Sequence, residues 1–260
     1  MRPRVYLYQE PAAPNLHLEE IRTYLEALIS FPVEAREELL AFWQGDREAL
    51  APAFARAKVR DPRRQDFPLP LPGEIDYERK RQASPRPPFG IVYEGLRVQA
   101  LYRDLIPREE RGLGHIHIAF TRQLLATWEE GRYHLRVGVF GSPSILSTTG
   151  VAEAPARPRE YYFLKQQYAA LGMGDVAAVR LEVEFAGRIL TPEDPRMTEV
   201  LKGYVLQAIF YQLTGEAFCP EKTCRLFNAH WQEEVIAAQL ESGALCARHQ
   251  KLLEDIRAAS

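Results

Sequence analysis

The three cysteines of this 260-residue chain lie near its C-terminal end, with a histidine close behind the last of them. Their spacing is Cys219-x4-Cys224-x21-Cys246-x2-His249. Two close pairs of such residues, about twenty residues apart, are typical of structural zinc sites. Zinc binds thiolate sulfur and imidazole nitrogen tetrahedrally, and a short spacing lets one turn present two ligands. The spacing therefore predicts one structural Zn2+ ion.

Two other roles for the cysteines stay open. A disulfide needs an oxidising compartment, and three cysteines would leave one thiol unpaired. Cysteines are also common in protein cores without any bound ligand. Neither role explains why His249 completes a set of four, so the metal site is the favoured interpretation.

The stretch AIFYQLTGEAFCPEKTCRL resembles the archaemetzincins, zinc metallopeptidases with the pattern HExxHxxGxxHC, then x4, CxM and later CxxC. Gly215 falls on the glycine of that pattern, Cys219 on the cysteine after the third histidine, and Cys224 on the cysteine of CxM. Cys246 and His249 fall on the final pair, with histidine in place of the last cysteine. In that family the four cysteines bind a second, structural zinc. The resemblance thus implies that this site is retained as Cys3His.

The resemblance does not extend to the catalytic zinc. Ala208 stands at the first histidine, Ile209 at the glutamate, Gln212 at the second histidine and Phe218 at the third. Without imidazole ligands zinc cannot be held there, and no group there accepts a proton from metal-bound water. The resemblance implies a pseudoenzyme whose vestigial cleft binds a peptide, a protein or a small molecule. An upstream stretch, SILSTTGVAEAPARPREYY, is similar to a related metallopeptidase-like group of unknown function and extends the match across roughly residues 89–253.

A second function stays open, a metal-dependent hydrolase or peptidase whose catalytic site has moved. His115 and His117 are two residues apart, so on a strand they point to the same face, and this spacing can hold a metal. His134, His17 or Glu153 could complete such a site. The simpler interpretation is a pair of histidines on a polar sheet face. A zinc count separates the two functions, because a single tightly held ion favours the pseudoenzyme and two ions favour the relocated site.

Other reactive side chains have simpler explanations. Ser142, Ser144 and Ser147 lie in GSPSILSTTG, which lacks the G-x-S-x-G elbow of a serine hydrolase and is typical of a loop that caps a strand. His230 and Trp231 are expected to pack beside the metal site.

The elements that must position these residues are predicted from periodicity and end signals. RVYLYQE, FGIVYEGLRVQALY, GHIHIAF and YHLRVGVFGSPSIL have strand-like patterns. The clearest helix spans residues 195–214, with Asp194 as N-cap, Pro195 first and Gly215 as the stop; it is apolar almost all round and should be buried. Two more helices are expected at residues 227–240 and 245–258. The fold class is α/β (α+β), a mixed β-sheet with packed helices, and the resemblance makes its C-terminal part metzincin-like.

Two regions differ in composition. Residues 1–88 form an N-terminal α/β segment that ends in a proline- and arginine-rich excursion at 60–88, and residues 89–260 form the archaemetzincin-like zinc domain. One continuous domain is the alternative. Acidic residues are interleaved with the arginines of the excursion, which favours a solvated loop over a nucleic-acid arm.

The overall composition excludes several classes of protein. The formal net charge is −2 with 26% charged residues, which gives no attraction for nucleic acid, so a zinc-ribbon nucleic-acid binder ranks last. No run of eighteen apolar residues marks a membrane span. A reducing cytoplasm is expected, because cysteines there hold metal rather than each other. Scarce asparagine and nineteen prolines fit a thermophile.

Overall fold

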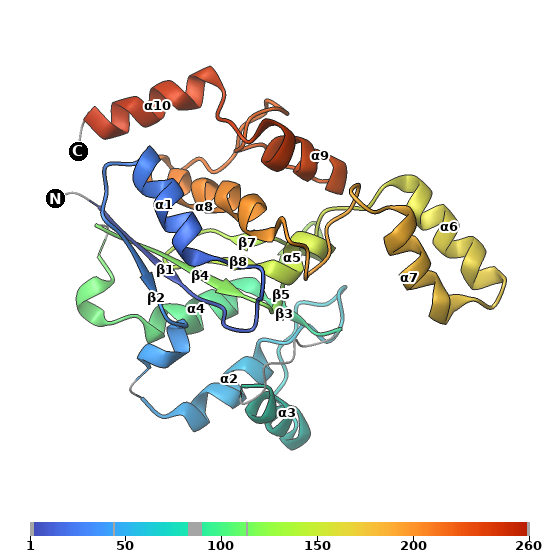
Figure 1. Cartoon of the computed structure of the whole chain (residues 1–260). Coiled ribbons are helices and arrows are strands. Elements are labelled where there is room, and N and C mark those ends of the chain that lie inside the picture. The colour runs from blue at the N-terminus through green and yellow to red at the C-terminus, as the bar shows by residue number, and fades with distance from the viewer. Residues whose placement is uncertain (1–2, 44, 83–89, 113, 259–260) are drawn as a thin grey trace.

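The structure is a computed structural model that describes residues 3–43, 45–82, 90–112 and 114–258. Its centre is a five-stranded sheet of order β2-β1-β4-β8-β7 (Figure 1). The first four strands are parallel neighbours, and β7 pairs antiparallel with β8. Their bounds are β1 Arg4–Tyr8, β2 Val33–Arg36, β4 His115–Thr121, β7 Gly138–Val139 and β8 Ser144–Ser147. A mixed sheet with packed helices confirms the predicted α/β class.

A second sheet and a set of helices complete the fold. The second sheet has the order β3-β5-β6, with bounds β3 Val92–Glu94, β5 Leu124–Glu129 and β6 Arg132–Arg136. The α-helices are α1 Leu18–Leu28, α2 Leu50–Arg56, α3 Pro72–Gln82, α4 Gly95–Leu105, α5 Thr148–Glu153, α6 Arg159–Ala170, α7 Gly174–Glu184, α8 Met197–Thr214, α9 Gln232–Ile236 and α10 Ala247–Ala258. Within the described ranges, no helix has both the length and the apolar character needed to cross a membrane.

Helices cover both faces of the central sheet. Successive side chains of a strand point to opposite faces, and the buried residues of β1 lie on both. Val5 and Leu7 of β1 pack into a core that includes α1 and α8. Tyr6 and Tyr8 point the other way, into a core that includes α2 and α4. Figure 1 shows α1 and α8 on one side of the sheet and α4 on the other. The molecule therefore has three layers, helix, sheet and helix.

Helix α8 is buried around most of its circumference, as predicted. Ala208 is 0% and Ile209 1% exposed. Gly215 ends the helix in the left-handed conformation with φ of 80°, which confirms the predicted stop.

The start of α8 differs from the prediction by two residues. The helix begins at Met197, so Pro195 is not its first residue. The Asp194 carboxylate accepts a hydrogen bond from the backbone N–H of Arg196 at 2.9 Å. It therefore closes a turn ahead of the helix instead of capping the helix itself.

The stretch FGIVYEGLRVQALY, predicted as a strand, is the short strand β3 followed by helix α4. The Glu94 carboxylate accepts a hydrogen bond from the Arg97 backbone N–H at 2.7 Å and so caps the helix. Val98, Tyr102 and Leu105 then recur at helical spacing and are buried. The strand prediction was wrong because the strand was extended past Glu94, the residue whose carboxylate caps the helix.

The proline- and arginine-rich excursion contains helix α3, and its residues 83–88 lie outside the described part of the chain. Glu78 of α3 is fully buried; it forms an ion pair with Lys58 at 2.8 Å and accepts a hydrogen bond from the Tyr93 hydroxyl at 2.8 Å. These contacts dock α3 onto the body through a buried charge.

The two C-terminal helices are shorter than predicted. The Glu234 carboxylate accepts hydrogen bonds from the backbone N–H groups of His230 and Trp231 at 3.0 and 3.3 Å, so α9 begins only at Gln232. A π-helical turn, Ala237–Ser242, continues it, and α10 follows.

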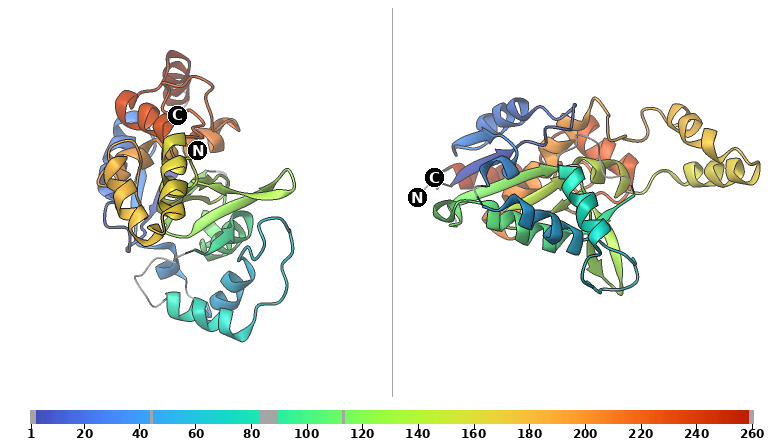
Figure 2. Two further views of the ribbon diagram at one scale, coloured as in Figure 1. Left: turned by 90° about the vertical axis from the view of Figure 1, so that its right-hand side faces the viewer. Right: turned by 90° about the horizontal axis from the view of Figure 1, so that it is seen from below.

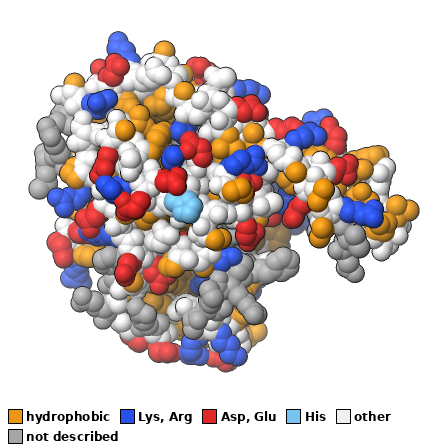
Figure 3. Space-filling view, viewed as in Figure 1, with side chains coloured by type: hydrophobic (Ala, Val, Ile, Leu, Met, Phe, Trp, Pro, Cys, Tyr) orange, Lys and Arg blue, Asp and Glu red, His pale blue; other side chains and the backbone are white. Residues whose placement is uncertain are grey.

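Helices α6 and α7 form a hairpin, called the arm below, which projects from the body (Figures 1 and 2). The arm has a small core of its own, made of Tyr161, Ala177, Leu181, Phe185 and Ile189. Figure 3 shows hydrophobic side chains on the surface of the arm. Four hydrophobic residues of the arm, Phe163, Leu171, Val179 and Val183, are 62–73% exposed.

Candidate metal centre

Three segments of the C-terminal region bring the four predicted zinc ligands together. Cys219 and Cys224 lie in the loops after α8, Cys246 precedes α10, and His249 lies in the first turn of α10. Their three sulfur atoms and a ring nitrogen of His249 all lie within 4.8 Å of one another. Residues separated in the chain thus form one compact set of four donors.

The distances within this set fit a tetrahedral ion. Bonds of about 2.3 Å to sulfur and 2.0–2.1 Å to nitrogen place two sulfurs about 3.8 Å apart and a sulfur about 3.6 Å from the nitrogen. The Sγ atoms of Cys219 and Cys246 are 3.8 Å apart, and Cys224 Sγ lies 3.7 Å from His249 Nδ1. Cys246 Sγ lies closer to His249 Nδ1, at 3.1 Å, so one edge of the tetrahedron is compressed. The donor set could hold a metal ion.

The surroundings of the sulfurs suit thiolate ligands. The backbone N–H of Glu221 donates to Cys219 Sγ at 3.4 Å, and that of Cys246 to Cys224 Sγ at 3.5 Å. Burial raises the pKa of the Cys219 thiol, raises the pKa of Cys224 to about 12, and lowers the pKa of His249. Without an ion the thiols of Cys219 and Cys224 are therefore protonated, whereas a coordinated thiol loses its proton because of the metal's charge.

Arg225 is a buried cation beside Cys224. Its side chain forms an ion pair with Glu199 and donates hydrogen bonds to the Tyr24 hydroxyl at 2.9 Å and the Gly243 carbonyl at 3.1 Å. These contacts tie the metal loop to α8, α1 and the π-helical turn. Local sequence gave no signal for this role, because the partners are distant in the chain.

The residues that the sequence resemblance aligns with a catalytic zinc site take part in packing and hydrogen bonding. Buried Ala208 and Ile209 face the core, and the Gln212 amide donates a hydrogen bond to the Gly141 carbonyl, which joins α8 to the loop before β8. The ring of Phe218 packs edge-on against Phe140, with centroids 5.7 Å apart. These side chains present neither imidazole nor carboxylate to a metal.

A small pocket of about 90 Å³ lies beside these residues. Its lining includes Tyr204, Gln207, Phe218 and His230. Gln207 is 1% exposed; its Nε2 donates to the Phe227 carbonyl at 3.1 Å, and its Oε1 has no hydrogen-bond partner among the described residues. The pocket thus contains a buried acceptor that remains unpaired.

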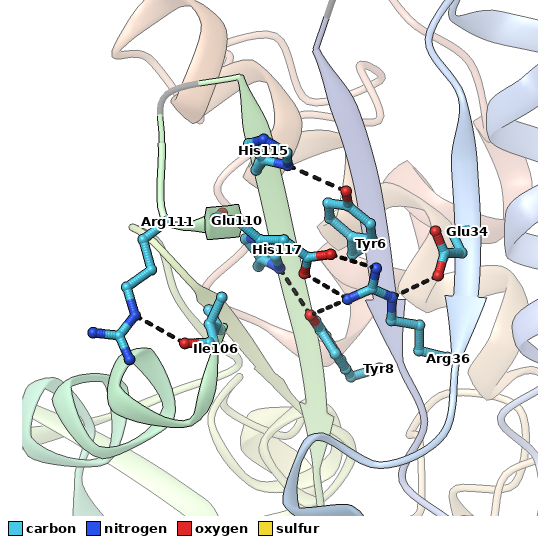
Figure 4. Close-up of polar contacts among 9 residues, drawn as sticks. All are labelled: Tyr6, Tyr8, Glu34, Arg36, Ile106, Glu110, Arg111, His115 and His117. Atoms are coloured by element: carbon cyan, nitrogen blue, oxygen red, sulfur yellow. Dashed lines mark hydrogen bonds and ion pairs between the residues drawn. The ribbon is translucent and has the colours of Figure 1, made fainter. Parts of the chain in front are cut away.

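His115 and His117 lie on the same face of β4, as predicted, beside Tyr6 and Tyr8 of β1 (Figure 4). His117 is 1% exposed and uses both ring nitrogens: Nδ1 bonds to the Tyr8 hydroxyl at 2.9 Å and Nε2 to the Glu110 carbonyl at 2.8 Å. A carbonyl oxygen only accepts, so Nε2 carries the proton and Nδ1 accepts from Tyr8.

An arginine completes this network. Arg36 donates to the Tyr8 hydroxyl at 3.1 Å and makes two bonds to the Glu110 carboxylate at 2.7 and 2.9 Å. The Tyr6 hydroxyl lies 3.1 Å from Nδ1 of His115.

The His115–His117 pair is not part of a candidate metal site. In the part of the chain that the structure describes, the group of three or more histidine, cysteine or carboxylate ligands that could hold a metal is the Cys3His set. Among the described residues, His115 and His117 form no group of three or more possible metal ligands with His17, His134 or Glu153.

The structure also shows where the serines of GSPSILSTTG and the residues His230 and Trp231 lie. The Ser147 hydroxyl caps α5 by accepting from the Gly150 N–H at 2.8 Å, and Ser144 bonds to the Gly141 backbone. Ser142 is exposed. His230 lines the pocket beside α8, and the Trp231 ring lies under the guanidinium of Arg159, 5.9 Å from its centroid.

Comparisons with known proteins give one family and one solved structure. The model of a family of unknown function (DUF7001) matches residues 6–252. No curated protein matches the chain. The crystal structure of archaemetzincin from Methanopyrus kandleri is similar over 98% of this chain and 95% of that chain, with 11% sequence identity and a TM-score of 0.49.

Proposed function

The chain belongs to the family of unknown function DUF7001, and we propose that it is an archaemetzincin-like zinc-binding protein without peptidase activity. In this proposal one structural zinc stabilises the C-terminal region, and the small pocket beside α8 binds a ligand. The protein works in a reducing compartment such as the cytoplasm, where free thiols remain available to metal.

The observation that carries the metal assignment is the compact set of four donors, which lie within 4.8 Å of one another. Three sulfurs and one imidazole nitrogen are the ligands that structural zinc prefers, and hard cations such as Mg2+ prefer oxygen. Bound zinc would join the end of α8 to α10, so its binding energy would be partly folding energy.

The side chains at the motif positions support the absence of peptidase chemistry. Metzincin hydrolysis needs a metal with an open position and a base that can take a proton. Buried Ala208 and Ile209 offer neither, and the Gln212 amide is engaged with Gly141. The aromatic ring of Phe218 occupies the position of the third ligand in the motif.

The pocket beside α8 supports the binding role. The unpaired Gln207 Oε1 would accept a hydrogen bond from an N–H or O–H group of a ligand, and Phe218 and Tyr204 provide apolar walls. A peptide, a protein segment or a small molecule with such a donor could satisfy it. Ligand binding here would rest on hydrogen bonds and packing.

Metal analysis tests the first part. We expect purified protein to contain about one zinc per chain by plasma mass spectrometry. Cys224→Ser should lower both the zinc content and the melting temperature, since it removes a ligand. Thr223→Ser, a change at the exposed neighbour, should alter neither. Zinc-free wild-type protein with an unchanged melting temperature would contradict the assignment.

Peptide libraries test the second part. We expect no cleavage with added zinc, in the wild type or in Gln212→Ala. Turnover that needs zinc and disappears in Gln212→Ala would overturn the proposal, and turnover lost only in His115→Ala would favour the relocated site. Peptides that bind uncut should shift pocket resonances in NMR spectra, and Gln207→Leu should weaken that binding.

A further inference from the structure

The carboxyl ends of three neighbouring parallel strands meet at one edge of the five-stranded sheet. Glu38 follows β2, Glu10 follows β1, and Thr121 and Gln123 lie at the end of β4. From β1 the chain continues into α1 on one face, and it enters β4 after α4 on the other face. In open parallel sheets, ligands bind in the crevice outside the strand ends where the connections diverge in this way.

A pocket of about 90 Å³ lies at this place. One water molecule needs only about 10–15 Å³ of such volume, so the pocket has room for a small polar molecule. Its apolar floor includes Phe54 and Leu39. Polar side chains also line this pocket, which is called the strand-end pocket below. They include Glu10, Glu38, Arg81, Tyr102, Thr121 and Gln123.

Gln123 gives the strand-end pocket an unpaired donor. The residue is 2% exposed, and its backbone is fixed: its N–H donates to Thr121 Oγ1 at 3.1 Å and its carbonyl accepts from the Ser147 hydroxyl at 2.6 Å. The side-chain Oε1 lies 3.5 Å from Thr121 Oγ1, whereas Nε2 has no partner among the described residues. Buried donors are nearly always paired in folded proteins, so this amide points to a ligand acceptor.

Charges of both signs converge on the same space. The Arg81 Nε donates to Glu78 at 2.7 Å, and its terminal nitrogens donate to no other described group. The Glu38 carboxylate has neither a hydrogen bond nor an ion pair within the described ranges. Tyr102 lines the same pocket, and burial raises its pKa to about 12 against the lowering effect of its hydrogen bond to Thr121.

Glu10 is held in place by the backbone. Its two carboxylate oxygens accept hydrogen bonds from the N–H groups of Ala12 and Arg122, each at 3.1 Å. A carboxylate oxygen has two acceptor sites, so each oxygen can still accept from a ligand. The acceptor at this end of the pocket is thus preorganised.

We propose that the strand-end pocket binds a small free α-amino acid, of the size of glycine, alanine or serine. The ligand carboxylate accepts from Arg81 and the Gln123 amide, and the ammonium group donates to Glu38 and Glu10. A simple anion would face two carboxylates, and a simple cation would face the guanidinium. A zwitterion is the small ligand that pairs both sets of charges. This site is independent of the proposed zinc site and of the pocket beside α8.

Calorimetric titration of the zinc-loaded protein tests the proposal. Glycine, L-alanine and L-serine are compared with acetate and methylammonium, each of which carries half of the proposed ligand. We expect saturable binding of at least one amino acid, and binding of each half-ligand that is at least about tenfold weaker, because one set of charges stays unpaired.

A matched pair of variants assigns the site. Glu38→Gln should weaken amino-acid binding about tenfold with an unchanged melting temperature, since the Glu38 carboxylate has no hydrogen-bond or ion-pair partner to lose among the described residues. Glu37→Gln, at the exposed neighbour, should leave binding unchanged. The absence of saturable binding for all three amino acids at about 10 mM would overturn the proposal. Acetate binding as tight as that of the amino acids, or equal losses in both variants, would do the same.

Discussion

At the scale of single residues, Arg225 should matter as much as the metal ligands beside it. Breaking a buried ion pair costs about 3–5 kcal/mol, because the remaining charge is left uncompensated. The side chain of Glu199 is 43% exposed, so water will compensate part of that cost. We expect Arg225→Met to lower the free energy of unfolding by about 2–3 kcal/mol and to speed zinc release to a chelator. Arg22→Met, at a surface pair, should cost less than about 1 kcal/mol; equal losses would contradict the account.

His117 should make stability depend on pH. Burial is the main cause that lowers the pKa of His117. The hydrogen bond to the Glu110 backbone and the charge of the Glu110 carboxylate oppose this shift, and the charges of Arg36 and His115 lower the pKa by smaller amounts. A histidine with a lowered folded pKa stabilises the fold above its unfolded pKa of about 6.5, and that stabilisation is lost as the pH falls below this value. His117→Gln can keep both hydrogen bonds but cannot titrate. Its free energy of unfolding should therefore fall less steeply from pH 7 to 5 than that of the wild type, as measured by urea denaturation; equal slopes would contradict this.

At the scale of elements, the contact between α8 and the π-helical turn depends on a glycine. A Cβ on Gly203 would lie 1.7 Å from Gln239 Oε1, and the Gln239 amide is held by its hydrogen bond to the Arg225 carbonyl at 2.8 Å. Gly203→Ala should therefore destabilise the protein by about 1–3 kcal/mol, although alanine favours helix. Gly73→Ala in α3 meets open space and should stabilise it by up to about 1 kcal/mol. Thermal unfolding of both variants measures the contrast, and a stabilised Gly203→Ala would refute the packing argument.

The elements also show what local sequence can and cannot predict. Helix α8 was predicted because its apolar residues and Gly215 are consecutive features of one segment, and the donor set because the cysteines have short spacings. Helix α4 was missed because one carboxylate, Glu94, decides between strand and helix. Contacts between distant segments gave no pattern to recognise: Arg225 meets Tyr24 across 201 residues, and Glu10 meets Arg122 across 112. Such pairs depend on the order of the strands, which single-segment patterns do not determine.

At the scale of the whole molecule, the arm should unfold separately from the body. Its core is a cluster of its own, distinct from the two cores that flank the sheet. An exposed ion pair at 2.6 Å, Arg188 with Glu233, links the base of the arm to α9, and such pairs contribute little. Regions with few buried contacts open at lower free energy than the core. We therefore expect amide hydrogens of α6 and α7 to exchange well before those of α8.

A single substitution separates local opening of the arm from global unfolding. Leu181 is 1% exposed in the arm core, so Leu181→Ala should cost about 2–5 kcal/mol locally and speed hydrogen exchange throughout α6 and α7. The protection of α8 and the zinc content should stay at wild-type values, because neither depends on the arm core. Val183→Ala, at a position 73% exposed, is the matched control and should leave exchange nearly unchanged. If Leu181→Ala speeds exchange in α8 as much as in the arm, the arm and body form one cooperative unit and the separation is refuted.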